Sequence, residues 1–389
     1  MVLQILRSAS KDEPHGLQSE TRKYLRCALV AVNVSRAKTC LLCHRSSQIV
    51  SLAIGICRDC LRNHFPAAYQ RVELIHADSR AAFDLPAKPP RHPGGICCAL
   101  CSNECVIDEG GRGFCGLRTV RAGKLTHLAG TPSHGLLHWY RDPLPTNCVA
   151  DWVCEGNQHP GSHNLAVFYA SCTADCLFCQ NWHFRQVSPT KSEMISAAEL
   201  ASVANARTFC VCFFGGDPAS QMPHALAASK LLAQRGVRVC WETNGTMHPK
   251  LLDAAVHYSL DTGGCLKFDL KAFDEALHIA LTGISNQRTL ENFACTARRF
   301  DERPDLPLVI ASTLLVPGYV DAEEVSKIAR FIVALNPQIP YALLAFAPSF
   351  YMSDLPCTSV RHAQEAPAAA RDAGLVNVRV GNRHLLGWD

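Results

Sequence analysis

The sequence has no apolar stretch that approaches a transmembrane helix, which requires about 20 consecutive apolar residues. The early apolar run that begins at Cys27 is shorter and follows charged residues, so it does not have the form of a secretory signal. Strong charge bias is also lacking, because the formal net charge of +4 is too weak to predict a nucleic-acid partner. We therefore expect a soluble, cytoplasmic protein whose 48% hydrophobic residues can form an ordinary globular core.

Cysteine is the residue type present in excess, with 21 in the chain. In a long chain without an export signal, clustered C-x2-C spacings predict metal sites rather than disulfides. The first set has the spacing C-x2-C-x13-C-x2-C and consists of Cys40, Cys43, Cys57 and Cys60. Two chelating turns of this kind are typical of a zinc-ribbon or rubredoxin-like site, and four thiolates would close it. We predict a structural metal at this position.

The second set has the spacing C-x2-C-x3-C-x9-C and consists of Cys98, Cys101, Cys105 and Cys115. It could hold zinc or an auxiliary iron–sulfur cluster, with zinc slightly favoured, and Cys97 is an alternative ligand. Cys148 and Cys154 could complete another site, pair with each other or be buried. Several scattered cysteines lie in apolar runs and are expected to be small buried apolar residues, among them Cys210, Cys212, Cys240 and Cys265.

The third set, Cys172, Cys176 and Cys179, has the spacing C-x3-C-x2-C and stops at three. Structural zinc sites and electron-transfer clusters are normally closed by four protein ligands. Three thiolates on a [4Fe–4S] cube would leave one iron open to another molecule, which is a catalytic arrangement. The alternative is a zinc knuckle, for which His183 could supply the fourth ligand.

A Pro- and Gly-rich stretch at 87–95 predicts a linker between domains. A helix is expected over 71–86, just before it, and another is an option around 17–31. The whole chain is then divided into an N-terminal extension (1–38), a zinc-ribbon-like module plus helix (39–86), the linker (87–95), a second cysteine-rich module and lead-in (96–160) and the main domain (161–389).

From about residue 164, short apolar runs alternate with helical patterns. The expected strands are 165–171, 208–216, 237–243, 265–271, 308–316 and 341–347. The expected helices are 196–205, 223–236, 248–259, 287–300 and 321–336, with Asp321 as an N-cap and Gly236 as a helix stop. Strands that alternate with helices predict parallel βαβ units. The predicted fold is α/β, a partial (β/α)6 TIM-like barrel whose chemistry lies at the C-terminal ends of its strands.

Polar motifs follow three successive strands of this predicted barrel. "FFGGDP" supplies Gly215, Gly216 and Asp217, "WETNG" supplies Glu242, Thr243 and Asn244, and "KFDLK" supplies Asp269 and Lys271. Two glycines let a backbone approach a ligand closely. Because Cys172 also follows a predicted strand, we expect these groups to line one site.

With these motifs the chain resembles the radical S-adenosylmethionine superfamily, in which C-x3-C-x-aromatic-C binds a [4Fe–4S] cluster; Phe178 is the aromatic residue here. Within it the chain is similar to glycyl-radical-enzyme activases such as pyruvate formate-lyase activating enzyme. It is also similar to the AmmeMemoRadiSam system radical SAM enzymes, on "CCALCSNECVIDEGGRGFCGLR" (97–118), "CQNW", "PYALLAFAPSFYMSDLP" (340–356) and "VRVGN" (378–382).

The resemblance implies reductive cleavage of S-adenosylmethionine to a 5′-deoxyadenosyl radical, with a reductant such as ferredoxin or flavodoxin as partner. It implies cofactor contacts from the backbone at Gly215 and Gly216 and from Asp217, Glu242, Thr243, Asn244, Asp269 and Lys271, the last two also facing substrate. The sequence departs from the family at two positions. The family usually has Glu where Asp217 stands, and activases usually have Asp where Glu242 stands.

The substrate is left open by the sequence. The activase-like motifs favour a protein, whereas modification or methylation of a small molecule or peptide uses the same cofactor. A non-enzyme alternative is a zinc- and iron–sulfur-binding electron-transfer or interaction protein, which would not cleave S-adenosylmethionine.

Overall fold

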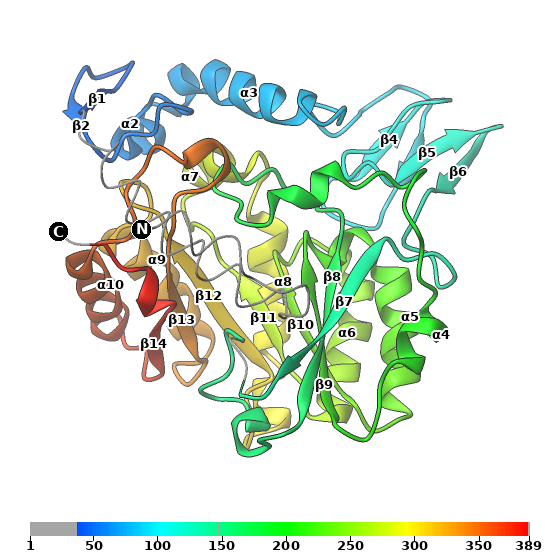
Figure 1. The fold of residues 1–389 in the computed structure, drawn as a ribbon. Coiled ribbons are helices and arrows are strands. Elements are labelled where there is room, and N and C mark those ends of the chain that lie inside the picture. The colour runs from blue at the N-terminus through cyan, green and yellow to red at the C-terminus, as the bar shows by residue number, and fades with distance from the viewer. Residues whose placement is uncertain (1–36, 146–147, 388–389) are drawn as a thin grey trace, which may run out of the picture.

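One eight-stranded sheet forms the centre of the computed structural model, which describes residues 37–145 and 148–387 (Figure 1). The option of a helix at 17–31 lies outside these residues. The strand order is β14-β13-β12-β11-β10-β9-β8-β7, and every neighbouring pair is parallel except β7 with β8. The strands are β7 (Leu137–Pro143), β8 (His163–Tyr169), β9 (Thr208–Gly215), β10 (Arg238–Thr243), β11 (Leu266–Asp269), β12 (Val309–Leu315), β13 (Tyr341–Ala345) and β14 (Val378–Gly381).

The helices between these strands cover one face of the sheet (Figure 1). They are α4 (Ala197–Ser202), α5 (Met222–Ala233), α6 (Pro249–Thr262), α7 (Glu275–Thr282), α8 (Gln287–Ala297), α9 (Ala322–Leu335) and α10 (Val360–Asp372). All six predicted parallel strands and all five predicted helices of this region are present, so the α/β prediction is confirmed. Asp321 caps α9 as predicted, since its carboxylate accepts a hydrogen bond from Glu324 N at 3.0 Å.

The segment that begins "HWYRDP" is a strand, although it is not among the strands that the sequence predicts. As β7 it pairs antiparallel with β8, from Leu137 opposite Tyr169 to Pro143 opposite His163. The apolar pattern of this strand is weak because most of its side chains are at least partly exposed; Tyr140, for example, is 47% exposed. β7 covers the β8 edge of the parallel sheet, whose backbone groups would otherwise lack partners.

Alternate residues of the parallel strands point to opposite faces, as strand geometry requires. Val239 and Trp241 of β10 pack with residues of the covering helices in the main core. Cys240, between them, belongs to a smaller apolar cluster on the other face, here called the inner face. The neighbouring strands add Cys210, Cys212 and Ile310, and Cys265 precedes β11. Residues 148–154 also contribute to the cluster, so they lie over the inner face.

The N-terminal third forms small elements that pack against the sheet domain. The paired strands β1 (Lys38–Thr39) and β2 (Ser46–Ser47) precede α2 (Arg58–Asn63) and α3 (Phe65–Ala81), and the hairpins β3–β4 (Ile96–Cys98, Cys105–Ile107) and β5–β6 (Arg118–Arg121, Lys124–His127) follow. Helix α3 overlaps the predicted helix at 71–86, but it begins earlier, at Phe65, and ends earlier, at Ala81. It runs along the top of Figure 1, from the first cysteine set to the hairpins of the second.

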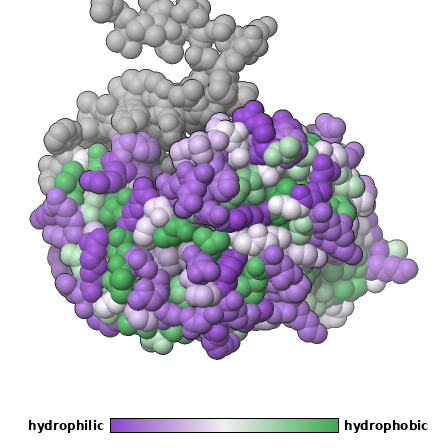
Figure 2. Space-filling view, turned by 90° about the horizontal axis from the view of Figure 1, so that it is seen from below, coloured by the Kyte–Doolittle hydropathy of each residue, from purple (hydrophilic) through white to green (hydrophobic). Residues whose placement is uncertain are grey.

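Contacts from α2 and from the loop before it hold the first cysteine module to the domain. Arg62 pairs with Glu324 at the start of α9, and Tyr319 Oη accepts a hydrogen bond from Ser51 N at 3.0 Å. Tyr319 Oη in turn donates to Ile56 O at 3.1 Å. On the face seen in Figure 2, apolar residues are scattered among polar ones. Among the described residues, no helix combines the length and apolarity needed to cross a membrane.

Candidate active site and metal centres

The C-terminal ends of β8, β9 and β10 are tied together through Asp217. Its backbone N–H donates to Ser171 O at 2.8 Å, after β8. Its carboxylate accepts hydrogen bonds from Thr243 Oγ1 at 3.0 Å and from Asn244 N at 2.6 Å, at the end of β10. Burial raises the pKa of Asp217 to about 6, although these hydrogen bonds act to lower it. The first two polar motifs therefore meet at one edge of the sheet.

The two glycines before Asp217 are required by the neighbouring strand. Gly215 has a φ of +107°, and a Cβ placed on Gly216 would lie 2.2 Å from Ser171 O. No side chain fits at that distance from a backbone oxygen. The backbone at Gly216 thus lies close to the backbone of Ser171, just before Cys172. The contact with a cofactor that we predicted for these glycines stays a prediction.

The loop of Cys172, Cys176 and Cys179 starts directly after β8 and touches the β10 motif. Asn244 Nδ2 lies 3.8 Å from Cys172 Sγ and donates to Thr173 Oγ1 at 2.9 Å. Burial raises the pKa of Cys176 to about 12, while the charge of Lys271 acts to lower it. A bound metal would therefore have to displace the thiol protons.

Asp175, inside the cluster loop, is a buried carboxylate with three partners. It forms an ion pair with Arg185 and accepts hydrogen bonds from Ser79 Oγ at 2.9 Å and from His76 Nδ1, whose distance is 2.7 Å. His76 and Ser79 lie on α3, so the N-terminal module holds the cluster loop. Burial would raise the pKa of Asp175, but the bond to His76 and the charge of Arg185 lower it.

Sequence reasoning missed this arrangement. Asp175 lies between Cys172 and Cys176, but nothing in the sequence indicated that a helix about 100 residues upstream supplies its partners. Only the spacing of His76 and Ser79, three residues apart and hence on one helix face, was available as a signal.

Asp269 and Lys271 form an ion pair of their own at the end of β11. Lys271 Nζ lies 2.8 Å from Asp269 Oδ2, and Ser312 Oγ donates to Asp269 Oδ1 at 2.8 Å. The ammonium also lies 5.8 Å from the ring centroid of Phe178 in the cluster loop. This places the third polar motif beside the loop of Cys172, Cys176 and Cys179, as predicted for a common edge.

Glu242 makes different contacts from the other predicted cofactor residues. Its carboxylate lies 3.1 Å from Lys267 Nζ and 3.9 Å from Cys148 Sγ, on the inner face. The adjacent Thr243 instead contacts Asp217. The two neighbours therefore point in different directions, and the cofactor role of Glu242 remains a prediction.

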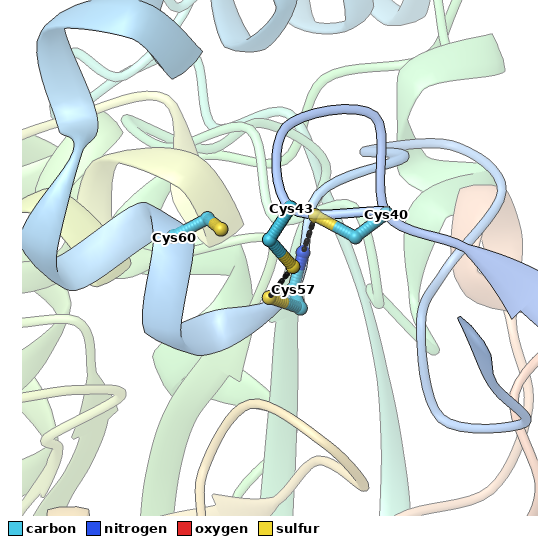
Figure 3. Close-up of side chains that lie close together, drawn as sticks. All are labelled: Cys40, Cys43, Cys57 and Cys60. Atoms are coloured by element: carbon cyan, nitrogen blue, oxygen red, sulfur yellow. Dashed lines mark hydrogen bonds between the residues drawn. The ribbon is translucent and has the colours of Figure 1, made fainter. Parts of the chain in front are cut away.

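The first cysteine set converges as a metal site. The sulfurs of Cys40, Cys43, Cys57 and Cys60 all lie within 4.8 Å of one another and point toward a common centre (Figure 3). Tetrahedral zinc holds thiolates at about 2.3 Å, which requires sulfurs this close together. Among described residues, no other group of three or more cysteine, histidine or acidic side chains meets that limit. A single-ion site made by Cys172, Cys176, Cys179 and His183 is therefore not formed.

We expect Cys40→Ser with Cys43→Ser to remove one zinc ion per chain and to lower the melting temperature markedly. Zinc binding contributes on the order of 10 kcal/mol in zinc-finger peptides, and this module has few other core residues. Metal analysis and thermal unfolding would measure both effects. Cys295→Ser, at an exposed cysteine, is the control. An unchanged zinc content in the double variant would contradict a metal at this position.

The second cysteine set surrounds a cavity but does not converge. Cys98, Cys101, Cys105 and Cys115 all line one cavity, which Thr173, next to Cys172, also borders. Their sulfurs are not all within 4.8 Å of one another. This spacing favours a group larger than one ion, so our slight preference for zinc gains no support. Cys97 is exposed and does not line the cavity.

Comparison with known proteins matches residues 166–332 to the Radical SAM superfamily. The isethionate sulfite-lyase activating enzyme of Desulfovibrio desulfuricans is 36% identical over 134 residues, which are 34% of this chain and 40% of that protein. An uncharacterized protein of Methanocaldococcus jannaschii is 25% identical over 303 residues, 73% of this chain and 80% of its own. The chain thus spans less than half the length of the activating enzyme.

Among solved structures, a domain of pyruvate-formate lyase-activating enzyme from Bacteroides vulgatus is 21% identical, with a TM-score of 0.36. The match covers 45% of this chain and 99% of that domain. The superfamily match itself contains the three-cysteine loop and the polar motifs at the ends of β9, β10 and β11. The chain is therefore similar to the radical SAM superfamily over residues 166–332.

Proposed function

We propose that this protein is an enzyme that cleaves S-adenosylmethionine reductively at a [4Fe–4S] cluster and abstracts hydrogen from a substrate. The observation that carries the proposal is the loop of Cys172, Cys176 and Cys179, which lies beside the polar ends of β9, β10 and β11. When bound, the cluster would supply one electron to the sulfonium, which releases methionine and a 5′-deoxyadenosyl radical.

The residues present fit such a cluster. Cys172, Cys176 and Cys179 offer thiol ligands, and Arg185 and Lys271 bring positive charge toward them. Burial acts to lower the pKa of Lys271, but Asp269 and the cluster-loop thiols raise it above its usual range. Two protonated side chains would balance the negative charge that thiolate ligands add to a buried site.

The other strand-end residues are proposed to position the cofactor. The backbone at Gly215 and Gly216 would meet its amino group, and Glu242 and Thr243 its carboxylate, while Asp217 and Asn244 hold the strand ends in register. Asp269 and Lys271 would face cofactor and substrate together. Segment 349–352 would cover this site as a lid. In support, Tyr351 N donates to Leu177 O at 3.0 Å, and Ser349 Oγ donates to Cys179 O at 3.2 Å.

A protein substrate is the form of the proposal that its relatives favour. The Desulfovibrio desulfuricans relative is named as an activating enzyme for another enzyme, and by analogy this chain would act on a protein partner. Ferredoxin or flavodoxin would supply the electron, and the reducing cytoplasm would keep the many thiols reduced. Modification or methylation of a small molecule or peptide is the second candidate, because it needs the same cofactor residues.

The test is anaerobic incubation of the purified chain with dithionite and S-adenosylmethionine. We expect 5′-deoxyadenosine and methionine in equal amounts, measured by liquid chromatography. An electron-transfer or interaction protein would bind iron without forming 5′-deoxyadenosine. A fully cluster-loaded chain that leaves S-adenosylmethionine intact would therefore overturn the proposal.

A further inference from the structure

Six cysteines surround a second cavity, on the inner face of the sheet. This cavity is lined by Cys148, Cys154, Cys210, Cys212, Cys240 and Cys265, together with Lys267. We expected the four strand cysteines to be small buried apolar residues and left Cys148 and Cys154 open. Their gathering around one cavity needs another explanation, because the cysteines come from four separate segments of the chain.

Strand register places four of these cysteines side by side. Cys240 of β10 pairs with Cys212 of β9, and Trp241 pairs with Leu266, which sets Cys240 beside Cys265. The sulfurs of Cys240 and Cys265 are 4.0 Å apart. Cys210 lies two residues before Cys212 and so on the same face. The loop that carries Cys148 and Cys154 closes the cavity from the opposite side.

A buried cation is part of the same cavity. Lys267 is 1% exposed, and its Nζ lies 3.1 Å from Cys148 Sγ and 3.0 Å from Cys212 Sγ. Its one carboxylate contact is Glu242, at 3.1 Å. Burying a charge is costly unless it is compensated, and Glu242 compensates this ammonium group from one side. Its other two contacts are sulfurs, so Lys267 is also placed to offset negative charge on them when the site is filled.

The spacing of the sulfurs excludes a single ion bound by three of them. No three lie within 4.8 Å of one another among the described residues, in contrast to the Cys40 set in the same chain. An iron–sulfur cluster spreads its thiolate ligands over several metal ions and is tuned by hydrogen bonds to its sulfurs. Lys267 is placed to donate such bonds.

We propose that this cavity binds an iron–sulfur cluster, separate from the one at Cys172, Cys176 and Cys179, with its ligands drawn from these six cysteines. The site does not rest on the proposed radical chemistry. It is linked to the strand-end site by the Lys267–Glu242 ion pair. Cys148 and Cys154 would add ligands from the loop, and the strand cysteines would hold the cluster against the sheet.

The experiment uses the full chain, produced anaerobically, in a background that carries Cys172→Ala, Cys176→Ala and Cys179→Ala. Two pairs of substitutions are added separately: Cys212→Ser with Cys240→Ser on the strands, and Cys148→Ser with Cys154→Ser on the loop. Cys295→Ser in the same background is the matched control. Iron, acid-labile sulfide and zinc are counted per chain, and the zinc of the Cys40 set reports on folding.

We expect each pair that retains zinc to lose two to four iron ions, and as many sulfide ions, relative to the control, as the common cluster types require. Any iron bound by Cys98, Cys101, Cys105 and Cys115 is present in every variant and in the control, so it does not affect the difference between them. Unchanged iron and sulfide in the folded pairs would overturn the proposal, as would a background protein free of iron. Loss of zinc from the loop pair with iron unchanged would also overturn it. Because the background lacks the first cluster, failure here leaves the proposed enzyme activity untouched.

Discussion

Replacing Cys172, Cys176 and Cys179 together with alanine will reduce 5′-deoxyadenosine formation from S-adenosylmethionine to that of a protein-free control. The three thiols are the proposed anchors of the cluster, and the triple substitution removes all of them. Without this cluster, the site beside the polar ends of β9, β10 and β11 has no group that can deliver an electron to the sulfonium. Product is measured after anaerobic reduction with dithionite.

Two controls separate loss of the cluster from loss of the fold. Cys295→Ala removes an exposed cysteine far from the motif in sequence and should leave product formation unchanged. Zinc bound by the Cys40 set should remain in the triple variant if the chain is folded. A folded triple variant that still produced 5′-deoxyadenosine would refute the assignment of the cluster to this loop.

Asp175→Asn will lower the free energy of unfolding by about 3–5 kcal/mol, the usual cost of breaking a buried ion pair from one side. The asparagine keeps the size of the side chain but leaves Arg185, whose side chain is 1% exposed, without its carboxylate. His76 loses its partner as well, since its other ring nitrogen already faces the carbonyls of Ile279 and Ala280. Denaturant titration measures the change, and iron content should fall with it.

Asp253→Asn is the matched control for this prediction. Asp253 also faces an arginine, Arg299, but its side chain is 81% exposed. Exposed ion pairs contribute at most about 1 kcal/mol, so this variant should unfold nearly as the parent does. If the two variants shifted the unfolding midpoint equally, Asp175 would have no special part in holding the cluster loop.

The order of strands and helices in the sheet domain could be predicted because buried parallel strands are continuous apolar runs. "TFCVCFFGG" and "LVIASTLLV" have this form and became β9 and β12. β7 and β14 were missed since they are edge strands with exposed residues, and their apolar signal is interrupted. Helices α7 and α10 were missed as well; α10 contains Pro367, which argues against a helix from sequence alone.

The candidate site could be predicted where its residues follow one another in sequence. The loop of Cys172, Cys176 and Cys179 and the three polar motifs each lie within a few residues of a strand end. Since the C-terminal ends of parallel strands in a barrel meet at one face, the sequence was enough to predict that these groups lie together. The partners of Asp175 and the cavity around Lys267 depend on contacts between distant segments. A signal for the cavity did exist: Cys210 and Cys212 alternate with apolar residues, which places both on one face of a strand.

Through helix α3, iron binding at the loop of Cys172, Cys176 and Cys179 would depend on zinc binding at the Cys40 set. The helix follows the first cysteine module directly, and its His76 and Ser79 hold Asp175 inside the loop of Cys172, Cys176 and Cys179, for which we propose iron binding. If zinc does not fold that module, α3 loses its anchor, and the loop loses the support that presents its thiols in the order an iron cluster needs. A cell starved of zinc would then accumulate this protein without iron, even with iron in ample supply.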